Sequence, residues 1–142
     1  MKELFLLLLI VTTQVSHSNA QKLNESQIPV MVKNAFEKKY PGTKANWDRE
    51  DSNYEANFTH KGRAMSTVIG KSGTIVETEI EISVTELPGP VQDYMKKNYP
   101  GLKIRGAARI VKSNGDVNYE AEVQGKDVVF DVNGKFIKEI KD

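Results

Sequence analysis

The chain reads Phe36-Glu37-Lys38-Lys39-Tyr40-Pro41-Gly42 at one point and Met95-Lys96-Lys97-Asn98-Tyr99-Pro100-Gly101 at another, 59 residues later. Upstream, Ser26-Gln27-Ile28-Pro29 is matched by Thr85-Glu86-Leu87-Pro88 at the same spacing. Downstream, Tyr54-Glu55-Ala56 returns as Tyr119-Glu120-Ala121, so the second copy has six extra residues before this triplet. Self-similarity in a constant order indicates that one structural unit is present twice.

Each copy is expected to open with a helix. Ser26 and Thr85 are plausible N-caps, and prolines follow in the first turn, where a missing N–H costs least. Apolar residues then recur at helical spacing, and Pro41-Gly42 or Pro100-Gly101 ends the helix.

Strands with a period of two follow each helix. In Tyr54–Thr59 the apolar side chains share one face, which is typical of a strand buried on one side. Asn114-Gly115 is a strong hairpin signal and accounts for the longer second copy. The predicted fold class is α+β: two tandem repeats, each one helix followed by a four-stranded antiparallel meander, with the two sheets side by side. The predicted repeats span 21–83 and 84–142.

Residues 1–20 are predicted to be a secretory signal peptide. Lys2 precedes the apolar run Leu4–Val11, and the small residues Ser18 and Ala20 suit cleavage after Ala20. The alternative is a membrane anchor, but a span needs about 20 apolar residues. The expected location is periplasmic or secreted, with no stable membrane anchor after cleavage.

Composition excludes several classes of function. Twenty basic and 19 acidic residues give a net charge of +1, which favours neither nucleic acid nor an anionic membrane as a partner. The absence of cysteine rules out disulfides, a thiol nucleophile and thiolate metal sites.

The repeated pattern, Leu/Ile-Pro, Tyr-Pro-Gly and Tyr-Glu-Ala followed by glycine turns, resembles the PepSY-like, beta-lactamase-inhibitor-protein-like domains of bacterial envelopes. Those domains are common in Bacteroides-type bacteria. The resemblance spans nearly all of 21–142 and implies an envelope location and helix-plus-sheet repeats. It also suggests, by analogy, a module that binds or restrains an enzyme, although the inhibitor that gives the family its name has disulfides and this chain has none.

The sequence does not show the nucleophile, base and orienting group that nucleophilic catalysis requires. The mature chain has one histidine, His60, which is expected in an exposed turn without triad partners. No cofactor and no metal are expected, and the chain is predicted not to be an enzyme.

Carboxylates are the most numerous candidates for chemistry. Asp48, Glu50 and Asp51 cluster along the chain, and Glu77, Glu79 and Glu81 alternate along a predicted strand. One interpretation is a weak Ca²⁺ site or an acid–base pair. The other is an acidic loop and a strand face in contact with solvent, and the spacing of a calcium-binding loop is missing.

Two predicted hairpin tips are the candidate partner contacts, because such tips carry variable side chains on a rigid scaffold. They supply Arg49, Glu50, Asp51, Asn53, Lys112, Asn114 and Asp116. Trp47 is the candidate anchor if it faces outward, whereas an inward register would place it in the core.

Three functions follow from these observations. The preferred one is a non-catalytic module that binds an envelope protein, such as an enzyme. A module for small ligands or metals is the alternative, and an enzyme ranks last. The sequence does not indicate an oligomeric state.

Overall fold

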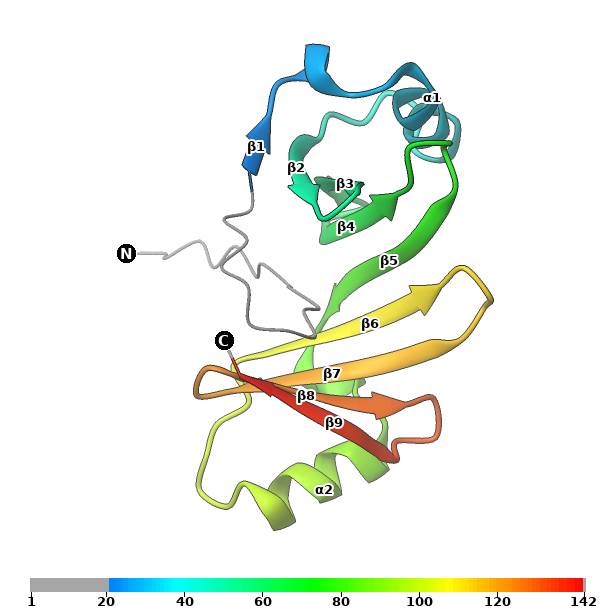
Figure 1. Cartoon of the computed structure of the whole chain (residues 1–142). Coiled ribbons are helices and arrows are strands. Elements are labelled where there is room, and N and C mark those ends of the chain that lie inside the picture. The colour runs from blue at the N-terminus through cyan, green and yellow to red at the C-terminus, as the bar shows by residue number, and fades with distance from the viewer. Residues whose placement is uncertain (1–20, 142) are drawn as a thin grey trace.

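The computed structural model of the chain describes residues 21–141. The predicted signal sequence and its cleavage after Ala20 lie outside the described residues. A 3-10 helix, an α-helix and four strands follow one another along the chain, and this series occurs twice (Figure 1). The elements are β1 (Gln21–Leu23), η1 (Glu25–Gln27), α1 (Val30–Lys39), β2 (Asn46–Glu50), β3 (Asn53–His60), β4 (Arg63–Ile69), β5 (Ile75–Ile82), η2 (Val84–Glu86), α2 (Gly89–Asn98), β6 (Gly106–Lys112), β7 (Val117–Val123), β8 (Lys126–Asp131) and β9 (Phe136–Lys141).

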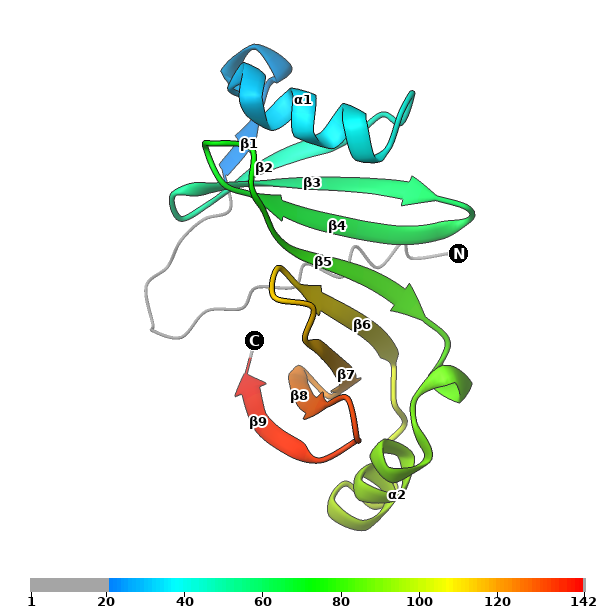
Figure 2. The same ribbon diagram turned by 90° about the vertical axis from the view of Figure 1, so that its right-hand side faces the viewer.

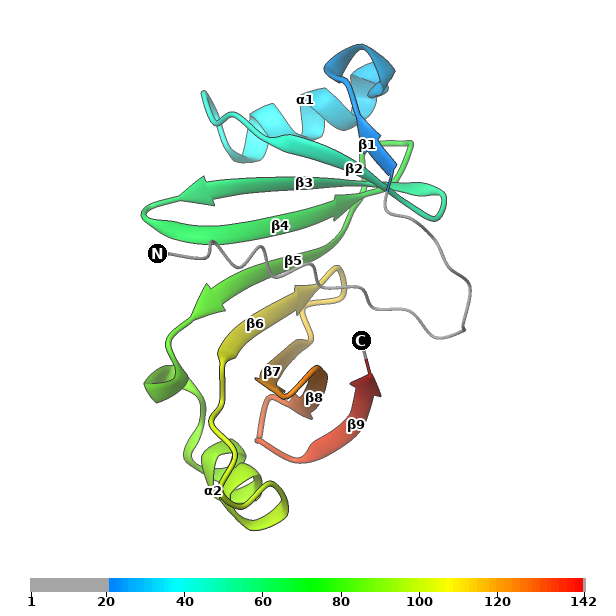
Figure 3. The same cartoon turned by 90° about the vertical axis from the view of Figure 1, so that its left-hand side faces the viewer.

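The described strands form one antiparallel sheet of nine strands in chain order, from β1 to β9. The predicted architecture of two four-stranded repeats is therefore wrong, although the α+β class describes the composition. Strands β5 and β6 pair from Glu77↔Lys112 to Ile82↔Ala107, so the two halves share hydrogen bonds. Pairing of these two strands removes two sheet edges that separate meanders would expose. The short strand β1 pairs with β2 and adds a strand that precedes the first helix (Figure 3).

The helices begin later than the sequence predicts. Pro29 and Pro88 occupy the N-cap positions of α1 and α2, whereas Ser26 and Thr85 lie inside the short 3-10 helices η1 and η2. At the start of each 3-10 helix, the N-cap backbone N–H donates to the side chain of the third helical residue. Asn24 donates to Gln27 over 2.7 Å, and Ser83 donates to Glu86 over 2.7 Å. Asn24 and Ser83 are the N-caps of η1 and η2, so the expectation that Ser26 and Thr85 cap the α-helices is wrong.

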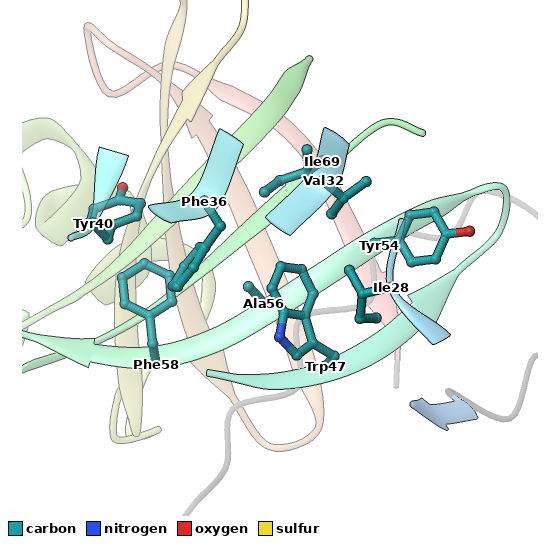
Figure 4. Packing of buried hydrophobic residues seen from close by; sticks show 9 residues of the cluster. All are labelled: Ile28, Val32, Phe36, Tyr40, Trp47, Tyr54, Ala56, Phe58 and Ile69. Atoms are coloured by element: carbon teal, nitrogen blue, oxygen red, sulfur yellow. The ribbon is translucent and has the colours of Figure 1, made fainter. Parts of the chain in front are cut away.

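Each helix covers its own hydrophobic core on the sheet. Under α1, the Phe36 ring lies 5.0 Å from Phe58 and 5.5 Å from Trp47, centroid to centroid (Figure 4). Under α2, the core contains Val91, Met95 and Phe130, all at most 2% exposed. The molecule thus has two cores on one continuous sheet.

The sheet is bent into an open C, with α1 and α2 on its outer side (Figure 2). Register shifts between Val68 and Ile69 and between Val129 and Phe130 fall at matching places in the two halves. Such bulges bend a strand and increase its twist, which accounts for part of the curvature. Within residues 21–141, neither helix has the length and apolarity that a membrane span requires.

The open sheet face as a candidate binding surface

The two faces of the sheet differ in what covers them. Alternation sends Trp47, Ala56 and Phe58 toward α1, and Ala121, Val128 and Phe130 toward α2. The helices therefore cover the same side of the sheet, which we call the outer face. The opposite side carries the intervening strand residues, and we call it the open face.

Acidic side chains dominate the open face. The register places Asp48 beside Glu55, Glu77 beside Lys112, and Glu122 beside Asp127. The acids that alternation places on this face are Asp48, Glu50, Glu55, Glu77, Glu79, Glu81, Glu120, Glu122, Asp127 and Asp131. The basic residues that alternation places there are Lys22, Lys112 and Lys138.

Several of these acids are buried although no helix covers them. Glu55 is 6% exposed, Glu79 8% and Glu120 1%. Curvature accounts for this burial, because side chains on the inside of a bend crowd together. Lys138 on β9 lowers the pKa of Glu77 on β5, whereas in a flat sheet these strands would lie roughly 19 Å apart. The open face is therefore concave.

Burial and mutual repulsion shift the acids toward their neutral form. Burial raises the pKa of Glu120 to about 9, with further increases from Asp127, Glu79 and Glu122. Burial likewise raises the pKa of Glu79 to about 8, and the charges of Glu55, Glu77 and Asp127 add to it. When one of these carboxyl groups ionises, its negative charge raises the pKa of the neighbouring ones.

The same effects extend into the first half of the face. Burial raises the pKa of Glu50 to about 7, and nearby Glu55 and Glu77 increase it further. Burial also raises the pKa of Glu77, although the ammonium groups of Lys112 and Lys138 offset part of this shift.

The first candidate hairpin divides between the two faces. Arg49 lies on the outer side, where its guanidinium donates to the Tyr54 hydroxyl over 2.9 Å and lies over the Tyr54 ring. Glu50 lies on the open face, Asp51 occupies the turn with a φ of 50°, and Asn53 begins β3.

The second candidate hairpin has hydrogen bonds within its turn and one to β5, where the Ser113 N–H donates to the Val76 carbonyl over 2.9 Å. The Asn114 carboxamide donates to Asp116 over 2.8 Å, and Lys112 on the open face ends β6. Both hairpins lie at the same end of the sheet because β2 and β6 run toward it, but β4 and β5 separate them. Their role as partner contacts stays a prediction.

Two sequence candidates lie on the helix side. Trp47 is 6% exposed and packs edge-on against Phe36, so the structure has the inward register of the two alternatives. His60 ends β3, half-buried rather than in an exposed turn, and its ring lies 5.3 Å from that of Tyr40.

The sequence analysis did not identify Glu55 and Glu120 as candidate functional residues. They are the central residues of the repeated Tyr-Glu-Ala triplet, which was interpreted as a structural motif only. Alternation carried the signal: if the tyrosine and alanine face the core, the glutamate between them faces the other side.

In the part of the chain that the structure describes, no three His, Cys, Asp or Glu side chains are grouped so as to hold a metal ion. A groove of about 650 Å³ lies where β5 passes into η2, lined by Glu81, Val84, Lys103, Arg105 and Glu122 among others.

Comparison with known families identifies a family model that matches both copies of the repeat. The model of the beta-lactamase-inhibitor-like, PepSY-like family matches residues 14–75 and again 70–138. The chain belongs to this family. The resemblance drawn from the repeated motifs is thereby confirmed, and it is an inhibitor-like family rather than an enzyme family.

Solved structures share the fold of this PepSY-like chain. A candidate periplasmic protein from Bacteroides eggerthii aligns with a TM-score of 0.74 at 15% identity, covering 80% of this chain and 88% of that one. A DUF2874 family protein from Bacteroides uniformis gives 0.73 at 19% identity, with the same coverage. A BLIP-like protein from Bacteroides fragilis gives 0.61 at 23% identity, covering 78% and 84%. Comparison with curated proteins finds no match.

Proposed function

We propose that this PepSY-like protein is a non-catalytic, periplasmic or secreted module that binds a protein partner, as an enzyme inhibitor would, on the open face of its sheet. One observation carries the proposal: both helices lie on the outer face, so the described elements leave a concave face of strands uncovered. Family membership and the BLIP-like fold support a binding role. The description of a fold relative as periplasmic supports the location.

The open face is suited to a protein rather than to a small molecule. It extends across strands of both halves, and specific protein interfaces bury about 800 Å² on each partner. Its side chains are held by a hydrogen-bonded sheet, so a partner would meet a preorganised surface with little ordering cost.

The test is capture with matched variants. Tagged chain 21–142 is incubated with an envelope extract of the parent bacterium, and retained proteins are identified by mass spectrometry. Val68→Trp and Asn118→Trp add bulk to the open face, whereas Asn34→Trp adds it to the exposed side of α1. We expect one partner to be retained by the wild type and Asn34→Trp and lost from both open-face variants. Equal retention by all four proteins contradicts the proposal.

Small-ligand binding is the second candidate, and the groove beside η2 is the observation in its favour. A ligand that binds only the native state raises the melting temperature by mass action. A thermal-shift screen of small molecules, with Arg105→Ala as the groove variant, tests it. A shift that Arg105→Ala abolishes would support this function.

A further inference from the structure

We infer that Glu120, flanked by Glu122 and Asp127, forms a receptor on the open face for an arginine side chain of the partner protein. The inference rests on the proposed function and specifies the chemistry of the partner. It is carried by a comparison between the two halves of the same chain.

The two copies of the Tyr-Glu-Ala triplet place equivalent glutamates in different surroundings. In the first copy, hydrogen bonding by the Ser66 and Asn57 side chains lowers the pKa of Glu55 against the effect of its burial, and the Asn57 carboxamide also donates to Asp48 over 3.0 Å. Asn57 and Ser66 sit opposite each other in the register of β3 and β4. Glu55 therefore has polar neighbours that favour its carboxylate, and its oxygens are not among the buried ones that lack a hydrogen-bond partner within residues 21–141.

In the second copy, the equivalent pair in the register of β7 and β8 is Glu122 and Asp127. The two donors of the first copy are thus replaced by two acids. Both carboxylate oxygens of Glu120 are buried and have no hydrogen-bond partner among the residues that the structure describes, and the residue is 1% exposed. Such a buried polar group costs stability unless something else satisfies it.

The missing component is a donor with positive charge. The neighbours of Glu120 across the sheet are the apolar Ala108 and Val129, and Glu79 lies near enough to raise its pKa. Lys138 on β9 and Arg105 at the groove are the basic groups on the adjoining elements, and both are outnumbered by these acids. A cation from outside would favour the ionised form of Glu120 and would complement the charge of its acidic neighbours.

Arginine matches this site better than a metal or lysine. Within residues 21–141, no three acids are grouped so as to hold a metal ion. A guanidinium presents five N–H donors in a planar fork and is weakly hydrated, so it can meet several carboxylate oxygens in a buried place. Lysine has three donors on a strongly hydrated ammonium.

The experiment titrates chain 21–142 with N-acetyl-arginine amide and follows side-chain carboxyl signals by NMR. The neutral citrulline analogue and N-acetyl-lysine amide are run alongside at equal ionic strength. We expect saturable shifts at Glu120, Glu122 and Asp127 with the arginine probe, weaker shifts with lysine and none with citrulline. Saturation with citrulline, or with calcium chloride but not with arginine, would overturn the inference.

Matched variants test whether probe binding depends on the receptor or only on the overall negative charge of the open face. Glu120→Gln should weaken probe binding by about tenfold or more, whereas Glu55→Gln in the first copy should leave it unchanged. The double variant Glu122→Asn, Asp127→Ser keeps Glu120 but supplies the donors of the first copy, and it should abolish binding. Circular dichroism confirms that each variant is folded, and equal losses at Glu55 and Glu120 would contradict the site.

The result can be told apart from that of the capture experiment. If the arginine probe does not bind but open-face variants still lose the partner, this inference fails and the proposed function stands. If the probe binds and no partner depends on the open face, the proposed function fails instead.

Discussion

Gly73 and Gly134 show how single residues connect each helix to the sheet. They occupy matching turns, with φ values of +89° and +81°, and pack against the first turns of α1 and α2. A Cβ at Gly73 would lie 2.9 Å from the Met31 carbonyl oxygen, and one at Gly134 would lie 2.8 Å from the Pro90 Cβ. The turn glycines therefore serve close approach as well as backbone conformation.

Gly73→Ala tests this double role against Gly115→Ala. Both glycines have a φ of +89°, but nothing lies within 4 Å of a Cβ at Gly115. Left-handed backbone costs about 1–2 kcal/mol for alanine in either variant. The clash with backbone should add about 1–3 kcal/mol at Gly73 alone. Urea denaturation measures the difference, and equal losses in the two variants would show that the close approach is unimportant.

At the scale of elements, the sequence predicted the repeat, the helices and most of the strands. Helical spacing of apolar residues and the alternation in Tyr54–Thr59 report directly on burial. It could not predict the β5–β6 pairing, because no local pattern distinguishes an edge strand from one that pairs with a second repeat. Strand β1 has three residues, too few to show a period. The acidic face was missed because curvature, which buries Glu120, is a property of the assembled sheet.

Helix α1 is held by aromatic contacts of Phe36, whereas α2 makes its aromatic contacts through Tyr94, with Phe130 and Phe136. Phe36 contacts Tyr40, Trp47 and Phe58, whereas the matching position in α2 is Met95. We expect Phe36→Leu to destabilise the protein by about 1–3 kcal/mol, because each aromatic pair adds about 0.5–1.5 kcal/mol beyond burial. Met95→Leu conserves volume and should cost less than about 1.5 kcal/mol. Urea denaturation compares the two, and a larger loss from Met95→Leu would contradict this account.

At the scale of the whole molecule, one sheet couples two cores. Trp47 is the only tryptophan and lies in the first core, so its fluorescence reports on that half. Met95→Ala creates a cavity in the second core and should cost about 2–5 kcal/mol. We expect this variant to lower the midpoint of the Trp47 transition by as much as that of the far-UV circular dichroism. If the Trp47 midpoint is unchanged, the halves unfold independently despite the β5–β6 pairing.

The acidic face also sets how the stability of the whole molecule depends on pH. The pKa values of Glu50, Glu79 and Glu120 are raised from 4.5 to about 7, 8 and 9. Between these limits the folded protein binds more protons than the unfolded chain, so stability is greatest near pH 5 and falls as the pH rises to 9. Glu86 has the opposite shift, since Arg63 lowers its pKa to about 2, and its contribution is lost only below pH 4.5.

Thermal melts from pH 5 to pH 9 should therefore show a falling midpoint, by an amount that corresponds to a few kcal/mol. Glu120→Gln removes the largest of the three shifts, so it should flatten the curve and raise the melting temperature at pH 8.5 with little effect at pH 5. Lys112, Lys138, Glu77, Glu122 and Asp127 remain in place and keep the local field. Glu81→Gln removes one charge from an exposed position on the same face and serves as the control. If Glu81→Gln and Glu120→Gln flatten the curve equally, net charge rather than the buried carboxyl governs the pH dependence.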